Sequence, residues 1–456
     1  MTMASLFKGY DRKTGYLLPP SLNDWLQKDH LAYFVADIVE SIDLSEIKNT
    51  YKQGGAKGYS PEILISLIFY GYMTGVFSSR KIENATFDSI AFRYLAANQH
   101  PDHDTIASFR QRFLPQLKGI FIQILAIARE MGVKKVGTVS IDGTKVKANA
   151  SKHHSLSWGY ANKLEERLQS EIADLMKRAE EADCEKEDSG MKIPEEISIR
   201  EKRLQGITEA KAIIAARAEE RYALEKAQYD EKISKREEKN AREGKKRTGK
   251  QLLAPTCGPK DRDQVNITDA ESRIMKTGGG FDQCYNAQAA VDIHSMLIVM
   301  ADVTIHANDK KEIEPAIENI EKIPKNIAEI DTILADSGFH SAANMERCIE
   351  HKIAPLIAEK REKHHQSPTE RFAEPLPLSE NATAAERAAH RLKTQEGKRL
   401  YAKRKSTVEP VFGIIKQVMG FRRFMLRGEK KVKSEWDLVA ICWNIKRLHK
   451  IKTSMT

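Results

Sequence analysis

The chain is poor in cysteine, and the few cysteines it has are isolated. Its 456 residues contain 5 of them (Cys184, Cys257, Cys284, Cys348 and Cys442), with no CxxC pair. This pattern excludes a disulfide framework and a cysteine-based zinc site, and it is typical of a reducing compartment. The first residues, MTMASLFKGYDRKTGY, lack the apolar core of a secretory signal, so we expect a cytoplasmic protein.

The sequence also has no apolar run long enough to favour a membrane span. The most apolar stretch, PEILISLIFYGYMTGVF at residues 61–77, contains Glu62 and is interrupted by Gly71 and Gly75. A membrane helix needs about 20 apolar residues, so we interpret this stretch as a buried core helix that begins at Pro61. With 41% hydrophobic and 30% charged residues, the composition indicates a soluble protein.

Several common catalytic patterns are absent. GxxxxGK[ST] does not occur, and KTGGGF at residues 276–281 lacks the lysine that would make it a phosphate-binding P-loop. Neither GxSxG nor HExxH is present, which argues against a serine hydrolase and a zinc protease of the usual types. The pairs His153–His154 and His364–His365 lie in polar segments without the i, i+4 spacing of a metal-binding helix.

What the sequence has in excess is positive charge. The formal net charge is +10 and the isoelectric point is near 9.1. Such a balance favours a polyanionic partner, either nucleic acid or an anionic membrane surface. Charge alone is weak evidence, because many basic proteins bind neither.

Residues 1 to about 130 have the pattern of short helices. IASFRQRF (residues 106–113) follows Asp104, a helix-capping residue type, and places Arg110 and Arg112 beside the apolar Ile106 and Phe109. Basic residues on short helices next to turns resemble a helix-turn-helix module. A plain helical bundle explains the same pattern equally well.

Between about residues 158 and 250 the sequence is dominated by charges of both signs. Apolar residues such as Leu164, Leu168, Leu204 and Ile214 recur at helical spacing within it. We interpret the segment as a two-helix antiparallel arm with a narrow apolar seam. Its end, SKREEKNAREGKKRTGK (residues 234–250), is predicted to be a mobile linker. A solvated helix face explains the charges better than a specific binding surface does.

Outside the arm, strands and helices alternate. One strand is predicted within residues 136–151 and two more within 281–305. Two further strands, near residues 332 and 352, each follow a predicted helix, over 313–323 and 342–350. Helices are predicted from Pro410 and over residues 436–448. This order predicts a mixed α/β sheet rather than a simple doubly wound one.

Three acidic residues stand where these strands end or a helix begins. Asp142 follows the aliphatic VSI, Asp336 follows ILA in TILADSGFHS, and Glu409 lies in the first turn of the helix that contains Pro410. Each has a plain structural explanation, since an aspartate before glycine favours a turn and a glutamate in a first turn complements the helix dipole. The apolar runs before Asp142 and Asp336 predict burial, however, and a buried unpaired carboxylate is costly.

A bound divalent cation would relieve that cost. Carboxylate oxygens suit Mg²⁺ or Mn²⁺, which also bind phosphate oxygens. Two such ions about 4 Å apart, held by three carboxylates, are suited to phosphodiester chemistry. We therefore predict that Asp142, Asp336 and Glu409 are catalytic if the fold brings them together.

Four stretches in this order resemble a bacterial insertion-sequence transposase of the DDE type: SIDGTKVKANAS, GGFDQCYNAQAAVD, ILADSGFHS and YAKRKSTVEPVFGIIKQVMGFRRFMLRG. YSPEILISLIFYGYMTGVFSSRKIE and HPDHDTIASFRQRF are similar to the helical N-terminal domain of that family. The resemblance implies an α/β, ribonuclease H-like mixed sheet with flanking helices, an all-α N-terminal domain and an inserted charged helical arm. It also implies that Asp142, Asp336 and Glu409 bind two Mg²⁺ or Mn²⁺ ions.

Such transposases often carry the pattern Y-x2-R-x3-E-x6-K around the glutamate. Tyr401, Arg404, Glu409 and Lys416 match it, except that four residues rather than three separate Arg404 from Glu409. Lys405 would restore the spacing in place of Arg404. The resemblance implies that Tyr401, Arg404 and Lys416 contact DNA, with Lys416 on a phosphate of the element's end.

Further basic residues are candidates for DNA binding. Arg422, Arg423 and Arg427 are interleaved with aromatic residues, which suits backbone phosphates. Arg110 and Arg112 are the candidates in the N-terminal part. A polar set on a predicted strand either contacts DNA or only lines a sheet edge; it consists of Gln283, Tyr285, Asn286 and Gln288.

The prediction is a cytoplasmic, nucleoid-associated transposase that acts as a homodimer. It binds double-stranded DNA at its element's ends and at the target, and no membrane. A catalytically silent DNA-binding protein and a nuclease without strand transfer are the alternatives. The chain is divided into a helical N-terminal DNA-binding domain (1–130), a first part of the catalytic core (131–157), the arm (158–255), a second part of the core (256–358), a charged insertion or mobile segment (359–396) and C-terminal helices that complete the core (397–456).

Overall fold

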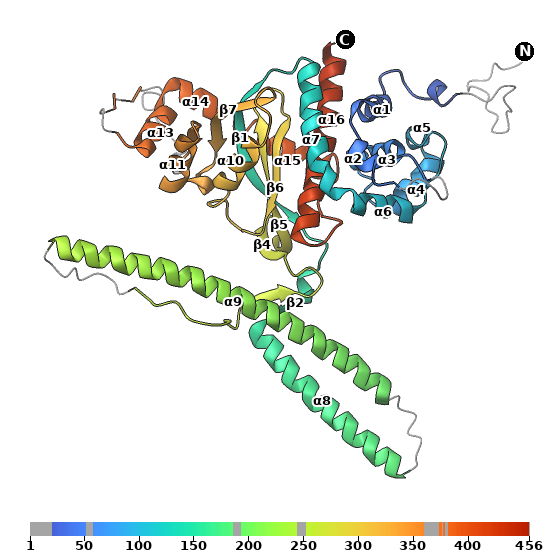
Figure 1. The fold of residues 1–456 in the computed structure, drawn as a ribbon, viewed down its shortest axis with the longest axis vertical. Coiled ribbons are helices and arrows are strands. Elements are labelled where there is room, and N and C mark those ends of the chain that lie inside the picture. Colours follow the sequence, from blue (N-terminus) through green and yellow to red (C-terminus); the bar gives the residue numbers. More distant parts are fainter. Residues whose placement is uncertain are drawn as a thin grey trace, which may run out of the picture.

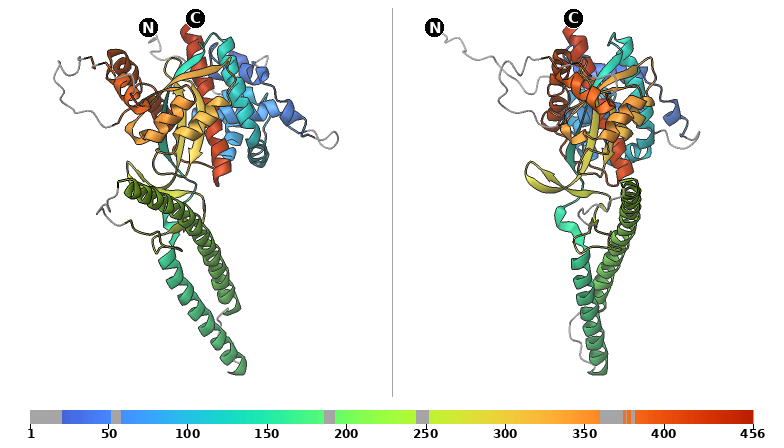
Figure 2. Two further views of the ribbon diagram at one scale, coloured as in Figure 1. Left: turned by 60° about the vertical axis from the view of Figure 1, so that its left-hand side comes forward. Right: turned by 90° about the vertical axis from the view of Figure 1, so that its left-hand side faces the viewer.

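A mixed α/β body carries a group of short helices on one side and a long helical arm that projects away from it (Figures 1 and 2). The computed structural model describes residues 21–51, 58–185, 193–243, 252–359, 374–375, 377–378 and 382–455. Within these ranges no single helix is long and apolar enough to cross a membrane, and only the pair 61–74 and 79–88, bent by 96°, passes the test jointly.

The centre of the body is a six-stranded sheet in the order β4-β5-β1-β7-β8, with β6 also paired to β5. Its strands are β1 (Val136–Lys147), β4 (Arg273–Thr277), β5 (Gly280–Asp292), β6 (Ile298–Thr304), β7 (Ala328–Ala335) and β8 (Ala354–Ile357). β1 is antiparallel to β5 and parallel to β7. β5 pairs with β4 through residues 280–284 and with β6 through residues 286–291. The sheet is mixed, as the order of elements predicts.

Helices connect and cover these strands. They are α10 (Ile313–Glu321), α11 (Ala342–Glu350), α13 (Ala384–Lys393), α14 (Gln395–Ala402), α15 (Val408–Gln417) and α16 (Glu429–Met455). α16 lies between the sheet and the N-terminal helices (Figure 1). Its Trp436 is fully buried and donates from Nε1 to the Gln288 carbonyl at 2.9 Å, and its Asn444 Oδ1 accepts from the Ile298 amide of β6 at 2.8 Å.

The N-terminal part consists of short helices, as the sequence indicates. They are η1 (Leu22–Asp24), α1 (Leu31–Ser41), α2 (Ser45–Lys48), α3 (Pro61–Thr74), α4 (Ser79–Asp88), α5 (Ile90–Leu95), α6 (His103–Arg112), η2 (Leu114–Gln116) and α7 (Leu117–Glu130). The apolar stretch at 61–77 forms α3, which begins at Pro61, is buried over most of its length, and stops where Gly75 adopts a left-handed φ of 84°.

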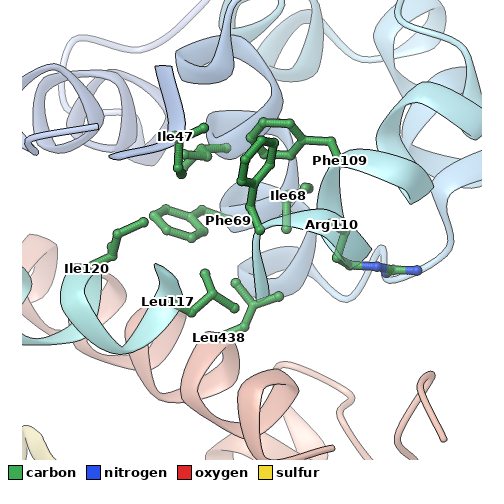
Figure 3. Close-up of a pocket in the computed structure, with 10 residues that line it drawn as sticks. Ile47, Ile68, Phe69, Phe109, Arg110, Leu117, Ile120 and Leu438 are labelled. Carbon is green, nitrogen blue, oxygen red and sulfur yellow. The ribbon is translucent and has the colours of Figure 1, made fainter. Parts of the chain in front are cut away.

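The N-terminal helices pack directly onto α16. In Figure 3, apolar side chains of α2, α3, α6 and α7 surround one small space together with Leu438 of α16, while the guanidinium of Arg110 points away from this apolar group. The gap between them has a volume of about 20 Å³, room for one water at most. Buried residues of the N-terminal helices, the sheet and α16 form one continuous core. The gap is therefore a packing feature of this interface.

The arm has a small core of its own. η3 (Lys152–His154), β2 (Ser155–Ser157) and β3 (Gln264–Asn266) form its base, and α8 (Trp158–Glu185) and α9 (Ile193–Glu243) form its length. The predicted seam residues Leu164, Leu168 and Ile214 are buried, together with Leu156 and Val265 of the base. Figure 1 shows α9 continuing past the start of α8.

Two local predictions need correction, and a third segment gains detail. Residues 234–243, predicted as part of a linker, continue α9. Lysine, arginine, glutamate and alanine favour a helix, and ion pairs such as Glu231–Lys235 stabilise it. The rest of the predicted linker, residues 244–250, lies outside the described ranges. Asp142 does not end its strand, because β1 runs on to Lys147. Part of the charged segment 359–396 is helical, since Thr383 and Glu386 form a capping box at the start of α13.

Candidate active site

Asp142 and Asp336 occupy matching places on adjacent parallel strands. The pairing of β1 with β7 sets Ser140 opposite Leu334, so Asp142 and Asp336 each lie two residues further along. Adjacent strands are about 4.8 Å apart, and β7 ends at Ala335. Both aspartates therefore reach the carboxyl edge of the sheet where β1 and β7 separate.

Asp142 is a largely buried acid. Its side chain is 19% exposed, and Oδ1 accepts a hydrogen bond from the Gly143 amide at 2.8 Å. Burial is the main cause that raises its pKa to about 6; the Gly143 amide and Arg404 act in the opposite direction, and the charges of Asp336 and Asp309 raise it further. The sheet thus holds a carboxyl group whose ionisation is opposed by its surroundings.

Asp336 is fixed by the turn that follows it. Its Oδ1 accepts from the Gly338 amide at 2.7 Å, which caps the short helix η4 (Ser337–Phe339). Phe339 is fully buried beneath the turn. The Ser-Gly sequence therefore turns the chain away and leaves the carboxylate at the end of the strand.

Glu409 lies in the first turn of α15, as predicted, and is connected to Asp142 through Arg404. The guanidinium of Arg404 is 3.3 Å from Glu409 Oε1 and 3.7 Å from Asp142 Oδ2. Arg404 is 8% exposed, whereas the Glu409 side chain is 50% exposed. Arg404 is the group that these two acids share in this structure.

The residues of the Y-R-E-K pattern lie together around β1. The Arg404 guanidinium is 5.9 Å from the centre of the Tyr401 ring. Lys416 Nζ donates to the Lys145 carbonyl at 2.8 Å and contacts Thr144 Oγ1, and burial lowers the pKa of its ammonium group. Lys416 therefore ties α15 to β1, and its contact with DNA remains a prediction.

A basic cavity lies at the far end of β1. It has a volume of about 410 Å³. Its basic lining consists of Lys147, Lys152, His153, His154, Arg423 and Arg427, and Asp282, which also lines it, forms an ion pair with Lys147 at 3.0 Å. Asn149 at its wall accepts from Arg427 Nε at 3.0 Å through its carbonyl. Arg422 lies nearby and donates to the Lys416 carbonyl at 3.1 Å. The predicted arginines Arg423 and Arg427 thus share one concave surface with residues that the sequence alone did not identify.

Arg110 and Arg112 differ in their surroundings. Arg110 donates to the Phe77 carbonyl at 2.9 Å and to Tyr72 at 3.4 Å, inside the N-terminal part. Arg112 is exposed, donates to the Thr50 carbonyl at 3.0 Å, and lies 5.6 Å from the centre of the Tyr51 ring. Their roles in DNA binding remain predictions, with Arg112 the more accessible of the two.

The donor chemistry of the acidic residues suits a hard divalent cation, because aspartate and glutamate oxygens are the ligands that Mg²⁺ and Mn²⁺ prefer. Asp142 and Asp336 provide such oxygens on a rigid sheet edge. Among the described residues, however, no three histidine, cysteine or acidic side chains converge as a ready-made metal site. Glu409, the third expected ligand, is paired with Arg404 at 3.3 Å in this structure.

Two acids thus occupy matching places on neighbouring strands of a mixed sheet, and a basic cavity lies further along β1. Residues 224–445 match a family model described as a transposase DDE domain, and residues 20–112 match one described as a transposase domain, DUF772. The chain belongs to the DDE transposases of insertion sequences, as the sequence motifs predict. The first match contains Asp336 and Glu409 and begins after Asp142. Comparison with curated proteins and with solved structures gave no match.

Proposed function

We propose that this protein binds the terminal repeats of its own mobile element, cuts phosphodiester bonds there with the help of a divalent cation, and joins the freed 3′-hydroxyl to target DNA. The observation that carries the proposal is the matched placement of Asp142 and Asp336 on adjacent strands. Membership in a family that generally uses divalent metal ions supports it.

The strand order supports a ribonuclease H-like core. β1, β5 and β6 form an antiparallel meander, and β7 and β8 then add in parallel on the other side of β1. The core would be assembled from residues 131–157, 256–358 and 397–456, with the arm inserted after its first strand. Residues 1–130 would form the N-terminal DNA-binding domain.

Asp142, Asp336 and Glu409 would hold the cation. When bound, Mg²⁺ or Mn²⁺ activates the attacking hydroxyl and stabilises the departing oxygen of a phosphodiester. Glu409 can take part only when Arg404 releases it, and a DNA phosphate is a suitable new partner for that guanidinium. Lys416 keeps the helix that carries Glu409 in place against β1.

The basic cavity would hold the DNA strand that leads away from the cut. Lys147 is five residues beyond Asp142 on the same strand, roughly 16 Å at about 3.3 Å per residue. Lysine and arginine side chains at this distance fit the next phosphates of a bound strand. Because an element has two ends to bring together, we propose a homodimer as the working form.

The test is cleavage of a labelled duplex that carries the element's own end, in Mg²⁺ or in chelator, by the wild-type protein and by Asp336→Asn. The asparagine keeps the shape of the side chain and removes its charge. Cleavage and joined products that require both Mg²⁺ and Asp336 would support the proposal. Cleavage without joining would favour a nuclease. Specific binding with no cleavage by either protein would favour a silent DNA-binding protein, and full activity of the variant would mean that the site is wrong.

A further inference from the structure

Helices α3 and α4 are joined by a short, sharp turn. The turn consists of residues 75–78, and α4 is bent by 96° from α3. Two helices at about 90–120°, joined by three or four residues that often include glycine, are the geometry of a helix-turn-helix unit. In such a unit the second helix lies in the major groove of DNA. The α3–α4 pair therefore has the angle and the turn length of a DNA-reading unit, with α4 as its second helix.

Two glycines make this turn possible. Gly75 adopts a φ of 84°, a conformation that favours glycine. Gly71 has no room for a side chain, because a β-carbon there would lie 2.6 Å from the Val76 carbonyl oxygen and 3.2 Å from Ile82 Cδ1. Ile82 is fully buried. The glycines thus let α4 reverse direction and pack closely against α3.

The unit is fixed to the body that carries the candidate active site. Tyr72 of α3 donates to Glu435 of α16 at 2.8 Å, and Lys446 of α16 donates to a backbone carbonyl in the last turn of α3 at 3.0 Å. Arg110 of α6 donates to the Phe77 carbonyl in the turn itself. Figure 1 shows α4 on the side of the N-terminal helices that faces away from the sheet. The direction of α4 is therefore set by contacts with α16 and α6, while its outer face is open.

The outer face of α4 is basic and polar, and its exposed residues recur at spacings of three and four. It consists of Arg80, Lys81, Asn84 and Phe87. Within the described ranges, the first three of these side chains have no hydrogen-bond or ion-pair partner. Of the acids on the same helix, Glu83 is paired with His103 Nδ1 at 2.8 Å, and Asp88 lies at the opposite end from the two basic residues. This face thus offers free donors to a polyanion.

Phe87 is an aromatic residue held in an exposed position. Its side chain is 57% exposed, and its ring stacks on that of His100, with the centroids 3.8 Å apart and the planes at 10°. His100 Nδ1 is in turn hydrogen-bonded to Thr86 Oγ1 at 3.0 Å. Phenylalanine in the major groove packs against the methyl group of thymine. The fixed, exposed ring is therefore suited to a base edge as well.

We propose that α4 reads the sequence of the element's ends in the major groove, with Arg80 and Asn84 on base edges and Lys81 on a phosphate. Arginine pairs with O6 and N7 of guanine, and asparagine pairs with N6 and N7 of adenine. The proposal rests on the binding of element ends proposed above and names the residues that distinguish those ends from other DNA. Helix α6 is less suited to this role, because both of its arginines already donate to backbone carbonyls.

The test compares the binding of two labelled duplexes, the element's own end and a scrambled sequence of the same composition, by fluorescence anisotropy in chelator. We expect Arg80→Ala and Asn84→Ala each to lower the preference for the element's end at least about fivefold, because one bidentate base contact discriminates by that factor or more. Lys81→Ala should weaken the binding of both duplexes alike. Asn326→Ala, a matched control at an exposed position before β7, should keep the wild-type preference.

Methylation of guanine N7, an atom of the major groove, gives a second measurement on the same proteins. Methylation of one guanine in the element's end should weaken wild-type binding and have no effect on Arg80→Ala. Melting temperatures check that the variants are folded, which is expected because these side chains are exposed.

The outcomes separate this inference from the function on which it rests. A wild type that prefers the element's end, with the same preference in Arg80→Ala and Asn84→Ala, would overturn the role of α4 alone. A wild type that binds both duplexes equally would overturn the proposed binding of element ends as well. Because binding is measured in chelator, a failure of cation-dependent cleavage leaves this test intact.

Discussion

The guanidinium of Arg404 lies 3.7 Å from Asp142 Oδ2 and holds Glu409 at 3.3 Å on its other side. Two of the three expected metal ligands are therefore neutralised by a side chain of the same protein. A cation and this guanidinium cannot both occupy the space between the two acids. If these acids bind a cation, as we propose, Arg404 would compete with it until a DNA phosphate draws the guanidinium away.

Replacement of Arg404 by alanine should tighten Mn²⁺ binding and slow DNA cleavage. The competing charge disappears, and an ion pair of this kind contributes up to about 1 kcal/mol, so we expect up to about fivefold tighter binding. Cleavage should fall because the proposed phosphate contact is lost. Mn²⁺ titration and single-turnover cleavage measure the two effects, with Arg399→Ala on α14 as a matched control at an exposed position. Weaker Mn²⁺ binding by Arg404→Ala would contradict the competition.

The stability of the body should depend on pH through Asp437. Burial on α16 raises the pKa of this carboxyl to about 6 from 3.8, while Lys118 at 3.4 Å lowers it. The folded protein therefore binds this proton more tightly than the unfolded chain between about pH 4 and 6. As pH rises through that window, the contribution of Asp437 to the free energy of unfolding falls, by up to roughly 3 kcal/mol for a shift of about two units.

Asp437→Asn should remove this dependence. The melting temperature of the variant relative to the wild type should increase from pH 4.5 to pH 7.5, because the asparagine does not ionise. Lys118→Met, which removes the nearby positive charge, should move the wild-type loss of stability to higher pH. A difference in melting temperature that stays constant with pH would show that Asp437 ionises as easily in the folded as in the unfolded state.

The basic cavity should contribute to DNA affinity in a salt-dependent way. Each lost phosphate contact lowers the slope of log K against log salt by about 0.9 for duplex DNA. We expect the slope to fall by about 0.9 in Arg423→Ala and by about twice that in the double variant Arg423→Ala/Lys152→Ala. Fluorescence anisotropy over a range of salt concentrations measures the slope. Lys325→Ala, at an exposed position before β7, should leave the slope unchanged. Equal slopes for all three variants would exclude the cavity from the DNA path.

The sequence was sufficient to locate the acids that follow local patterns. Asp336 and Glu409 lie where predicted, at the end of β7 and in the first turn of α15. The continuation of β1 beyond Asp142 has no local signal, because Asp-Gly favours a turn and a glycine weakens a strand. Gly143 remains in the strand because β5 pairs with it and because Asn286, Gln288 and Asp309 fill the space of a side chain.

Other features depend on contacts between distant parts of the chain and have no local signal. Asp309 lies in a polar, mostly exposed segment, which by pattern is an ordinary loop, and only the pairing of β5 with β1 brings it near Asp142. The ion pairs of Arg404 likewise depend on how the segment before α15 returns to β1. By pattern alone, the polar residues of β5 fit either DNA contact or a sheet edge, because the sequence does not show that Asn286 and Gln288 donate to Asp309.

Alanine variants of Arg110 and Arg112 should differ: the first should lose stability, and the second should lose DNA affinity. Arg110→Ala leaves the Phe77 carbonyl without its donor, which costs about 1–3 kcal/mol when the group is buried, so the melting temperature should fall. Arg112→Ala should melt near the wild type and bind element ends more weakly, with a lower salt slope. Both are compared in melting and anisotropy measurements. Unchanged DNA binding by Arg112→Ala would assign this helix to packing alone.

Glu435 should be the residue on which the position of the basic cavity depends most. It is fully buried on α16, and its carboxylate accepts from Tyr72 of α3 at 2.8 Å and from the amides of Met425 at 3.0 Å and Leu426 at 3.0 Å. These amides belong to the segment that carries Arg423 and Arg427. One side chain thus joins the N-terminal helices, α16 and the basic segment.

Glu435→Ala should destabilise the protein by several kcal/mol, since it leaves one hydroxyl and two amides without an acceptor at about 1–3 kcal/mol each. Glu435→Gln should cost less, because its Oε1 can still accept from the two amides while its amide group donates to the Tyr72 oxygen. DNA affinity in the glutamine variant should fall only if the basic segment shifts, so melting and anisotropy are measured together. Equal melting temperatures for the alanine variant and the wild type would show that this buried carboxylate does not hold the three parts together.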